Sequence, residues 1–181
     1  MQRITITIIL LLCLVFQGCK DHQQMLDQLV ELERQNQADS LMTNDSLAIT
    51  LCKYFDSHGT SNERMRAHYM LARTYSDRGE APQALEEFHT ATACADTTAE
   101  DCDYRLLGRV CSQAAGLFLG CSLYREMLDA LSLQYKYAKQ ANDTLTWIYA
   151  IGSKSEAYYM LGEKDSAIMS LQQADQLYKY D

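Results

Sequence analysis

The sequence predicts an all-α protein, built from antiparallel helix pairs that stack in tandem. Apolar residues recur at spacings of three and four after the first segment of the chain, which places them on one face of a helix. The chain has a single proline and only eight glycines, so its helices have few breaks. A pattern of small and large side chains also returns along the chain, and such internal repetition is typical of stacked repeats.

The N-terminal residues 1–18 resemble an export signal. Arg3 gives a positive start, and residues 4–16 are almost wholly apolar. As a helix this apolar stretch is about 20 Å long, which is too short for a hydrocarbon core of ~30 Å. Its length is that of a signal-peptide apolar region, so we exclude it from the predicted fold.

Residues 14–19 resemble a lipobox, the sequence at which bacterial lipoprotein signal peptidase cuts before a cysteine. Gly18 is the small residue such a site needs, and Cys19 is the thiol that would receive the lipid. The resemblance implies attachment to a membrane through acyl chains such as palmitate, because several chains together hold a protein firmly. An ordinary signal peptide with a chance cysteine is the alternative.

Residues 19–24 then form the predicted tether. In it, Lys20 is followed directly by Asp21, and such a pair resembles the surface-export signals of some Gram-negative lipoproteins. A plain solvated tether is an equal alternative. We expect the cell envelope as the location, with the outer membrane favoured over the inner one and the face left open.

The charge of the chain argues against nucleic acid as a partner. The formal net charge is −8, and loss of Arg3 with the leader would make it −9. Binding to DNA or RNA depends on Lys and Arg side chains that displace counterions.

Five cysteines follow Cys19, and an odd count leaves at least one of them unpaired or paired between chains. They are Cys52, Cys94, Cys102, Cys111 and Cys121. Cys94 and Cys102 flank a predicted loop and could form a disulfide. The alternative is that most are small buried residues. The chain contains no Cys-x-x-Cys pair, so a zinc ribbon is not supported.

The clearest repeat unit has a large–small pair and an aromatic residue in its first helix, a turn glycine, and an alanine–large–alanine series in its second helix. These residues are Leu71, Ala72, Tyr75, Gly79, Ala84, Phe88 and Ala91. Small side chains let two helices approach, and large ones fill the space beside them. Pro82 falls where the second helix begins, a position that tolerates proline. The unit resembles the tetratricopeptide (TPR) repeat, which implies a right-handed α-solenoid.

A second clear unit, with Lys154 at a position that is usually apolar, ends the chain. Its matching residues are Ser155, Tyr158, Gly162, Ala167, Leu171 and Ala174. A divergent unit lies between the two, and Ser122 replaces its turn glycine. Ser122 is 43 residues after Gly79 and 40 before Gly162, against about 34 in a TPR. The residues in excess of 34 per unit are expected at 97–103 and 140–144, or in longer helices.

Before these units, the pattern predicts a helix over residues 25–42 and a second one from the cap residue Asn44 to about His58. The predicted organisation is a leader at 1–18, a tether at 19–24, a hairpin forming a degenerate repeat at 25–63, and three TPR-like pairs at about 64–98, 103–141 and 144–181.

The joints at residues 104–109 and 140–145 resemble a subgroup of bacterial lipid-anchored TPR proteins. Longer members of that subgroup continue into a transmembrane helix and a DNA-binding or kinase module. The resemblance implies an alternative function, the sensing portion of an envelope signalling or transcription-regulating protein, truncated in this chain.

We expect no catalytic residue, metal or cofactor. The histidines are scattered, at His22, His58, His68 and His89. None has a second metal-type ligand at a spacing of three or four that recurs across helices. Glu86, Glu87 and His89 share one predicted helix, which we interpret as a solvated face. No phosphate-binding glycine loop or nucleophile elbow occurs, so an envelope enzyme is the least favoured alternative.

The working surface is expected to be a groove lined by the first helix of each pair, as the TPR resemblance implies. Tyr and Arg are enriched at binding hot spots. The candidate binding residues are Arg66, Tyr69, Arg73, Arg109, Tyr149, Glu156 and Tyr159. A protein or peptide of the envelope is the expected partner, and ordinary surface residues are the alternative.

Overall fold

The computed structural model describes the backbone of residues 2–38 and 40–179, and the side chains from Lys20 onward within these ranges. The described residues form eight helices and no strand, so the all-α prediction is confirmed. The helices are α1 (Gln2–Gln37), α2 (Asp45–His58), α3 (Ser61–Asp77), α4 (Ala81–Cys94), α5 (Tyr104–Gly120), α6 (Tyr124–Gln140), α7 (Thr144–Met160) and α8 (Lys164–Lys179).

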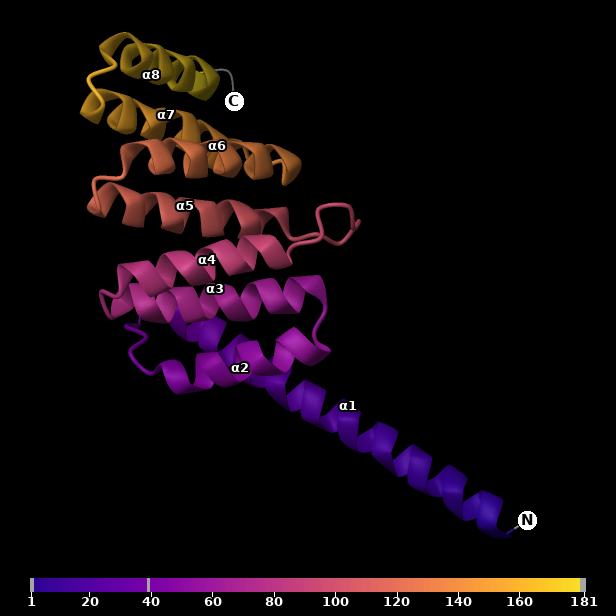
Figure 1. The fold of residues 1–181 in the computed structure, drawn as a ribbon. Helices are drawn as coiled ribbons and strands as arrows, with labels where there is room; N and C mark the ends of the chain where they lie inside the picture. The colour runs from indigo at the N-terminus through magenta and orange to yellow at the C-terminus, as the bar shows by residue number, and fades with distance from the viewer. Residues whose placement is uncertain (1, 39, 180–181) are drawn as a thin grey trace.

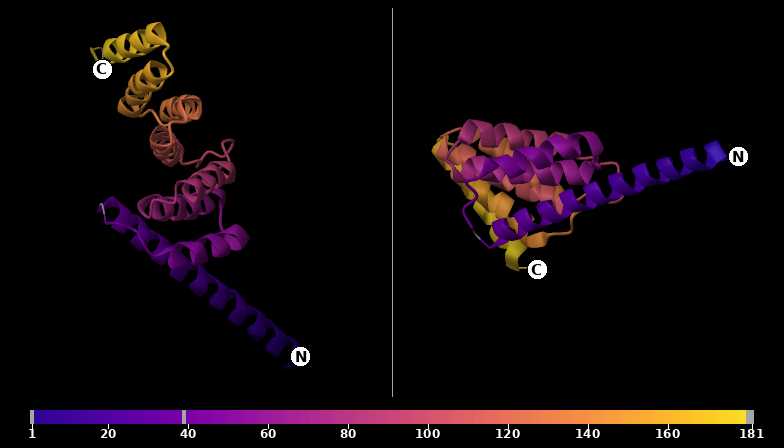
Figure 2. Two further views of the ribbon diagram at one scale, coloured as in Figure 1. Left: turned by 60° about the vertical axis from the view of Figure 1, so that its left-hand side comes forward. Right: turned by 90° about the horizontal axis from the view of Figure 1, so that it is seen from below.

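The helices form successive pairs that stack in one column (Figure 1). We call α1, α3, α5 and α7 the first helices of the pairs, and α2, α4, α6 and α8 the second helices. The backbones of successive first helices lie close together, whereas those of successive second helices do not approach each other in the described part of the chain. The first helices therefore line the inner side of the stack. Figure 2 shows that successive helix pairs are rotated relative to one another along the stack.

Helix α1 runs without a break through the predicted leader and tether. Its N-terminal half projects away from the stack (Figures 1 and 2). The first side-chain contact described between α1 and the stack is at His22, whose ring nitrogens lie 3.3 Å from the Tyr54 hydroxyl and 3.2 Å from the Glu63 carboxylate. Among the described residues, no helix combines the length and apolarity needed to cross a membrane.

The helix predicted to end at Met42 ends earlier, at Gln37. The Met42 N–H instead donates to Asp77 Oδ2 at 3.0 Å, which ties the connection to the end of α3. Asn44 then caps α2 by accepting from the Ser46 N–H at 3.1 Å, and this satisfies a free amide of the first turn.

Four of the turns between helices share one backbone form. The second residue after each helix has a positive φ: 77° at Gly79, 60° at Ser122, 53° at Asn142 and 79° at Gly162. The next amide reaches back five residues, as in the 2.8 Å bond from the Leu123 N–H to the Phe118 carbonyl. This is the Schellman arrangement, which satisfies the last carbonyls of a helix and favours glycine.

Replacing Ser122 with glycine is therefore expected to raise the free energy of unfolding by about 1 kcal/mol, because a left-handed residue other than glycine costs roughly 1–2 kcal/mol. Ser122 is exposed, so little packing is lost. Denaturation by urea measures the change. Gly162→Ser should lower stability by a similar amount, and two neutral results would contradict the expectation.

The extra length between repeats lies partly in a loop and partly in the helices. Residues 95–103 form a loop between α4 and α5, close to the predicted surplus at 97–103. The joint predicted at 140–144 is only a tight turn. Helices α5, α6 and α7 are 17 residues long each and take up the rest.

The buried core is largest in the first two pairs and thins toward α8. One cluster of buried side chains joins α1 to α5, and Phe55 and Phe88 are its largest fully buried members. A smaller cluster follows around Met127, Leu131 and Ala157. In α8 only Ala167 and Ser170 are buried.

Candidate functional site

A first hollow on the inner side lies between α1, α3 and α5. Both Nε and Nη2 of Arg66 donate to the Glu33 carboxylate at 2.7 Å. Arg73 donates to Asn36 at 3.1 Å and to Gln113 at 2.6 Å, so it links α1 to α5. These two predicted binding residues therefore hold neighbouring first helices together.

Tyr69 lies in the same hollow but is only 4% exposed. Its ring centroid is 6.0 Å from that of Phe88 on α4. The structure thus places Tyr69 mainly in the core, where its ring packs between the two helices of the pair.

A second hollow adjoins the first, between α5, α6 and α7. It is lined by Arg105, Gly108, Arg109, Ser112, Gln134, Asp143, Leu145, Thr146 and Tyr149. Arg105 and Arg109 lie one turn apart on α5 and line both hollows. Both are exposed, and neither forms a salt bridge with a described residue. We call the two hollows together the inner groove.

Gln134 contributes an unusual acceptor to the inner groove. The residue is 2% exposed, yet its Oε1 has no hydrogen-bond partner among the described atoms. Nearly all buried polar atoms have a partner, so each exception calls for an explanation. The sequence did carry a clue, because Gln134 interrupts the apolar series between Leu131 and Ala138.

Three further predicted residues divide between two surfaces. Tyr149 lines the inner groove and is 63% exposed. Glu156 and Tyr159 lie elsewhere, beside Ile168 and Leu171 at the end of the stack. The structure therefore brings Arg66, Tyr69, Arg109 and Tyr149 to one groove but does not bring Glu156 and Tyr159 there.

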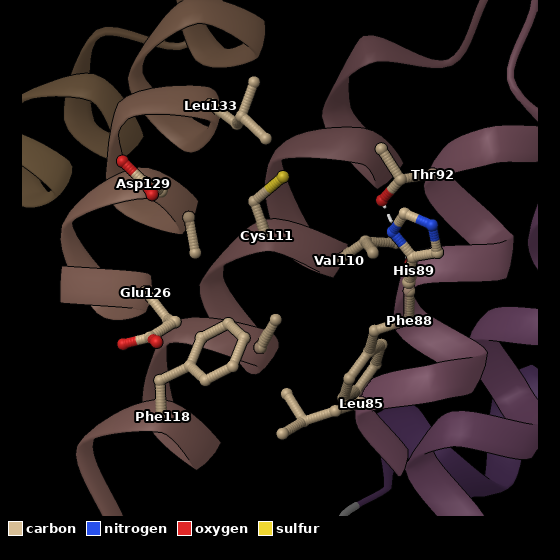
Figure 3. A pocket seen from close by; sticks show the side chains of 12 residues that line it. Leu85, Phe88, His89, Thr92, Val110, Cys111, Phe118, Glu126, Asp129 and Leu133 are labelled. Carbon is tan, nitrogen blue, oxygen red and sulfur yellow. Dashed lines mark hydrogen bonds between the residues drawn. The ribbon is translucent and has the colours of Figure 1, made fainter. Parts of the chain in front are cut away.

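A separate outer groove, not predicted, lies between α4, α5 and α6 (Figure 3). Leu85 and Phe88 of α4 face Phe118 of α5 across it, and Glu126 and Asp129 of α6 stand on the far side. The groove forms between helices of different pairs, which the repeat pattern treats as separate units.

A cluster of polar side chains around the buried His68, the His68 cluster, joins α2, α3 and α4. It comprises Cys52, Asp56, His68, Glu87 and Cys94. His68 is 7% exposed. Its Nδ1 lies 2.6 Å from Glu87 Oε2 and its Nε2 lies 3.0 Å from Asp56 Oδ1. The interpretation of Glu87 as part of a solvated face is wrong, because its carboxylate turns inward to His68.

The environment of His68 favours its charged form. Burial lowers the pKa of the imidazole, but hydrogen bonds with Cys52, Glu87 and Asp56 outweigh burial and raise the pKa to about 11. Burial also raises the pKa of the Cys52 thiol, although the nearby His68 opposes this. With both ring nitrogens protonated, His68 donates from Nδ1 to Glu87 and from Nε2 to Asp56.

Cys52 and Asp56, four apart on one helix, were the signal in the sequence for this cluster. Neither residue is a histidine, and His68 has no metal-type ligand three or four residues away on its own helix. Cys94 also belongs to the cluster, and it forms no disulfide with Cys102, since both are free thiols.

The fold matches that of solved repeat proteins. A Podosopora anserina protein, described as "putative kinesin light chain nearly identical TPR-like repeats", superposes with a TM-score of 0.64 over 83% of this chain and 73% of its own, at 15% identity. A variant of that protein gives 0.65 with the same coverage and identity. MamA gives 0.52 over 84% of this chain and 87% of its own, also at 15% identity.

No protein-family model and no curated protein matches the sequence. At 15% identity the structural likenesses establish the fold alone. The prediction of a TPR-like α-solenoid is thereby confirmed.

Proposed function

We propose that the chain is a lipid-anchored scaffold of the cell envelope that binds a protein or peptide segment in the inner groove. The observation that carries the proposal is the set of unused groups in one hollow. Arg105 and Arg109 are exposed cations without a salt bridge to a described residue, Gln134 offers a buried acceptor, and Tyr149 offers an exposed ring. The role is non-catalytic.

The bound segment should carry a carboxylate and a free N–H. Arginine recognises carboxylates by paired charge-assisted hydrogen bonds, and two arginines of this groove, Arg105 and Arg109, form no salt bridge with a described residue. A rotation of the buried Gln134 side chain toward the groove would let a backbone N–H of the segment donate to Oε1. An acidic or C-terminal peptide segment therefore fits the groove better than a basic one.

Anchoring through Cys19 is compatible with the helix packing. The side chain of Cys19 lies outside the described residues, but the described contacts of α1 with the stack begin at His22. Cleavage before Cys19 would remove the projecting half of α1 and leave these contacts in place. The location we propose is the cell envelope, with the outer membrane favoured over the inner one.

The anchor is tested by the intact mass of protein extracted from membranes. The expected mass is that of residues 19–181 with added acyl chains. Cys19→Ser should keep the leader and gain no lipid, whereas Cys13→Ser should be processed like the parent. An unlipidated parent cut at another position would contradict the anchor but leave the groove proposal standing.

Binding is tested in cells with a photocrosslinking amino acid in place of Tyr149. The matched control places the same amino acid at Ser132, an exposed position of α6 outside the inner groove. A discrete crosslinked species is expected only from position 149, and Arg105→Ala with Arg109→Ala should abolish it. Equal crosslinking from both positions would contradict a groove-bound partner.

Gln134→Met separates a binding role from a structural one. It removes a buried acceptor without a partner, so the free energy of unfolding should rise by about 1 kcal/mol. The crosslink from position 149 should nevertheless weaken. Urea denaturation and crosslink yield measure the two effects, and a loss of stability would show that Gln134 supports the fold instead.

A further inference from the structure

We propose that Cys52, His68 and Glu87 form a Zn²⁺ site in which Asp56 orients the imidazole. This inference is independent of the inner groove and of the lipid anchor. It concerns the first two helix pairs, where three helices meet at one buried histidine.

The ligand atoms are already gathered. One ligand atom from each of Cys52, His68 and Glu87 lies within 4.8 Å of the other two. In a tetrahedral zinc site, bonds of roughly 2.0–2.3 Å place neighbouring ligand atoms about 3.3–3.8 Å apart. Only small side-chain shifts are therefore needed, mainly a widening of the 2.6 Å contact between Glu87 Oε2 and His68 Nδ1.

The chemistry of the ligands selects the cation. A thiolate, an imidazole and a carboxylate together suit Zn²⁺, whereas Mg²⁺ and Ca²⁺ prefer sites made of oxygen atoms alone. Three protein ligands leave a fourth position for water or for a further ligand. A hydrogen-bonded ion cluster alone would need the carboxylates and His68, but it would not need a thiol on α2.

Asp56 has the position of the outer partner that zinc-bound histidines use. With Nδ1 on the metal, the Nε2–H of His68 donates to Asp56 at 3.0 Å, and such a carboxylate fixes the orientation of the ring. A second arrangement, with Asp56, His68 and Cys94, is also close enough. We favour the first because Cys52 is buried while Asp56 is exposed.

The proposed site is accessible to a cation from solvent, and nearby carboxylates and a thiolate would balance the charge of the bound metal. The Glu87 and Asp56 side chains are 21% and 50% exposed, so the cluster is open on the carboxylate side. Binding releases the protons of the His68 Nδ1 and the Cys52 thiol to solvent. The metal charge then stands where the imidazolium charge stood, facing Glu87, Asp56 and the new thiolate.

The test is titration of the full-length protein, reduced and stripped of metal, with Co²⁺ as a spectroscopic probe. One equivalent should produce a thiolate-to-cobalt charge-transfer band, and Zn²⁺ should displace it. Cys52→Ala should lose the band. Cys111→Ala, which removes an equally buried thiol, and Cys121→Ala, which removes an exposed one, should both keep it.

Two further measurements distinguish the loss of a ligand from the loss of the fold and test which residues bind the metal. Circular dichroism should show the same helix content in Cys52→Ala and Cys111→Ala, and Zn²⁺ should raise the melting temperature only of the latter. Glu87→Gln should keep the band but weaken Co²⁺ binding by at least roughly tenfold. The proposal is overturned if the parent shows no band, if Cys52→Ala retains it, or if only Cys94→Ala loses it.

Discussion

His68→Leu is expected to lower the free energy of unfolding of the metal-free protein by about 3 kcal/mol. The change removes the cation that pairs with Asp56 and Glu87 while both carboxylates stay in place. Breaking a buried ion pair from one side costs roughly 3–5 kcal/mol, because an uncompensated charge remains. The lower end applies, since Asp56 is half exposed and can turn to water.

The measurement is urea denaturation, with His89→Leu as the control on an exposed histidine of α4. The control should change stability by no more than about 0.5 kcal/mol. Adding Glu87→Gln to His68→Leu should recover part of the loss, because it removes the charge left behind. If the loss of unfolding free energy in the double variant equals the sum of the losses in His68→Leu and Glu87→Gln, the two residues do not act as a pair.

The fold was predictable because its determinants are local. Gly79, Ala84 and Phe88 follow each other at fixed spacings within one helix pair. In the structure Gly79 forms the turn with its positive φ, and Ala84 and Phe88 are buried in the core. Helix lengths were harder to predict. The segment after α1, which the pattern predicted as helix, is tied to Asp77, a residue more than thirty positions away that accepts from the Met42 amide.

The groove residues were predictable only in part. The spacing that puts Arg66 and Arg109 on the first helices says nothing about their partners. Arg66 forms a salt bridge with Glu33 of a different helix, whereas Arg109 forms no salt bridge with a described residue. Which arginine is free depends on how one pair meets the next. The same holds for the His68 cluster: the spacing of Cys52 and Asp56 puts both on one face of α2, but their partners come from two other helices.

The second large effect is expected from Phe88→Ala, which should lower the free energy of unfolding by about 3–5 kcal/mol. Phe88 is 1% exposed and packs on Tyr69, so truncation leaves a cavity between α3 and α4. It also forms a wall of the outer groove. Phe118 is only partly buried, so Phe118→Ala should lower the free energy of unfolding clearly less than Phe88→Ala does.

The same variant tests how far the stack unfolds as one unit. Phe88 belongs to the larger buried cluster, whereas the chain's one tryptophan, Trp147, lies in α7 near the thinner end. In repeat proteins each unit contacts only its neighbours, so stability is a sum of local terms. Phe88→Ala should therefore lower the midpoint followed by circular dichroism more than the midpoint followed by Trp147 fluorescence. Coincident midpoints would mean that the larger and the smaller buried clusters unfold as one unit.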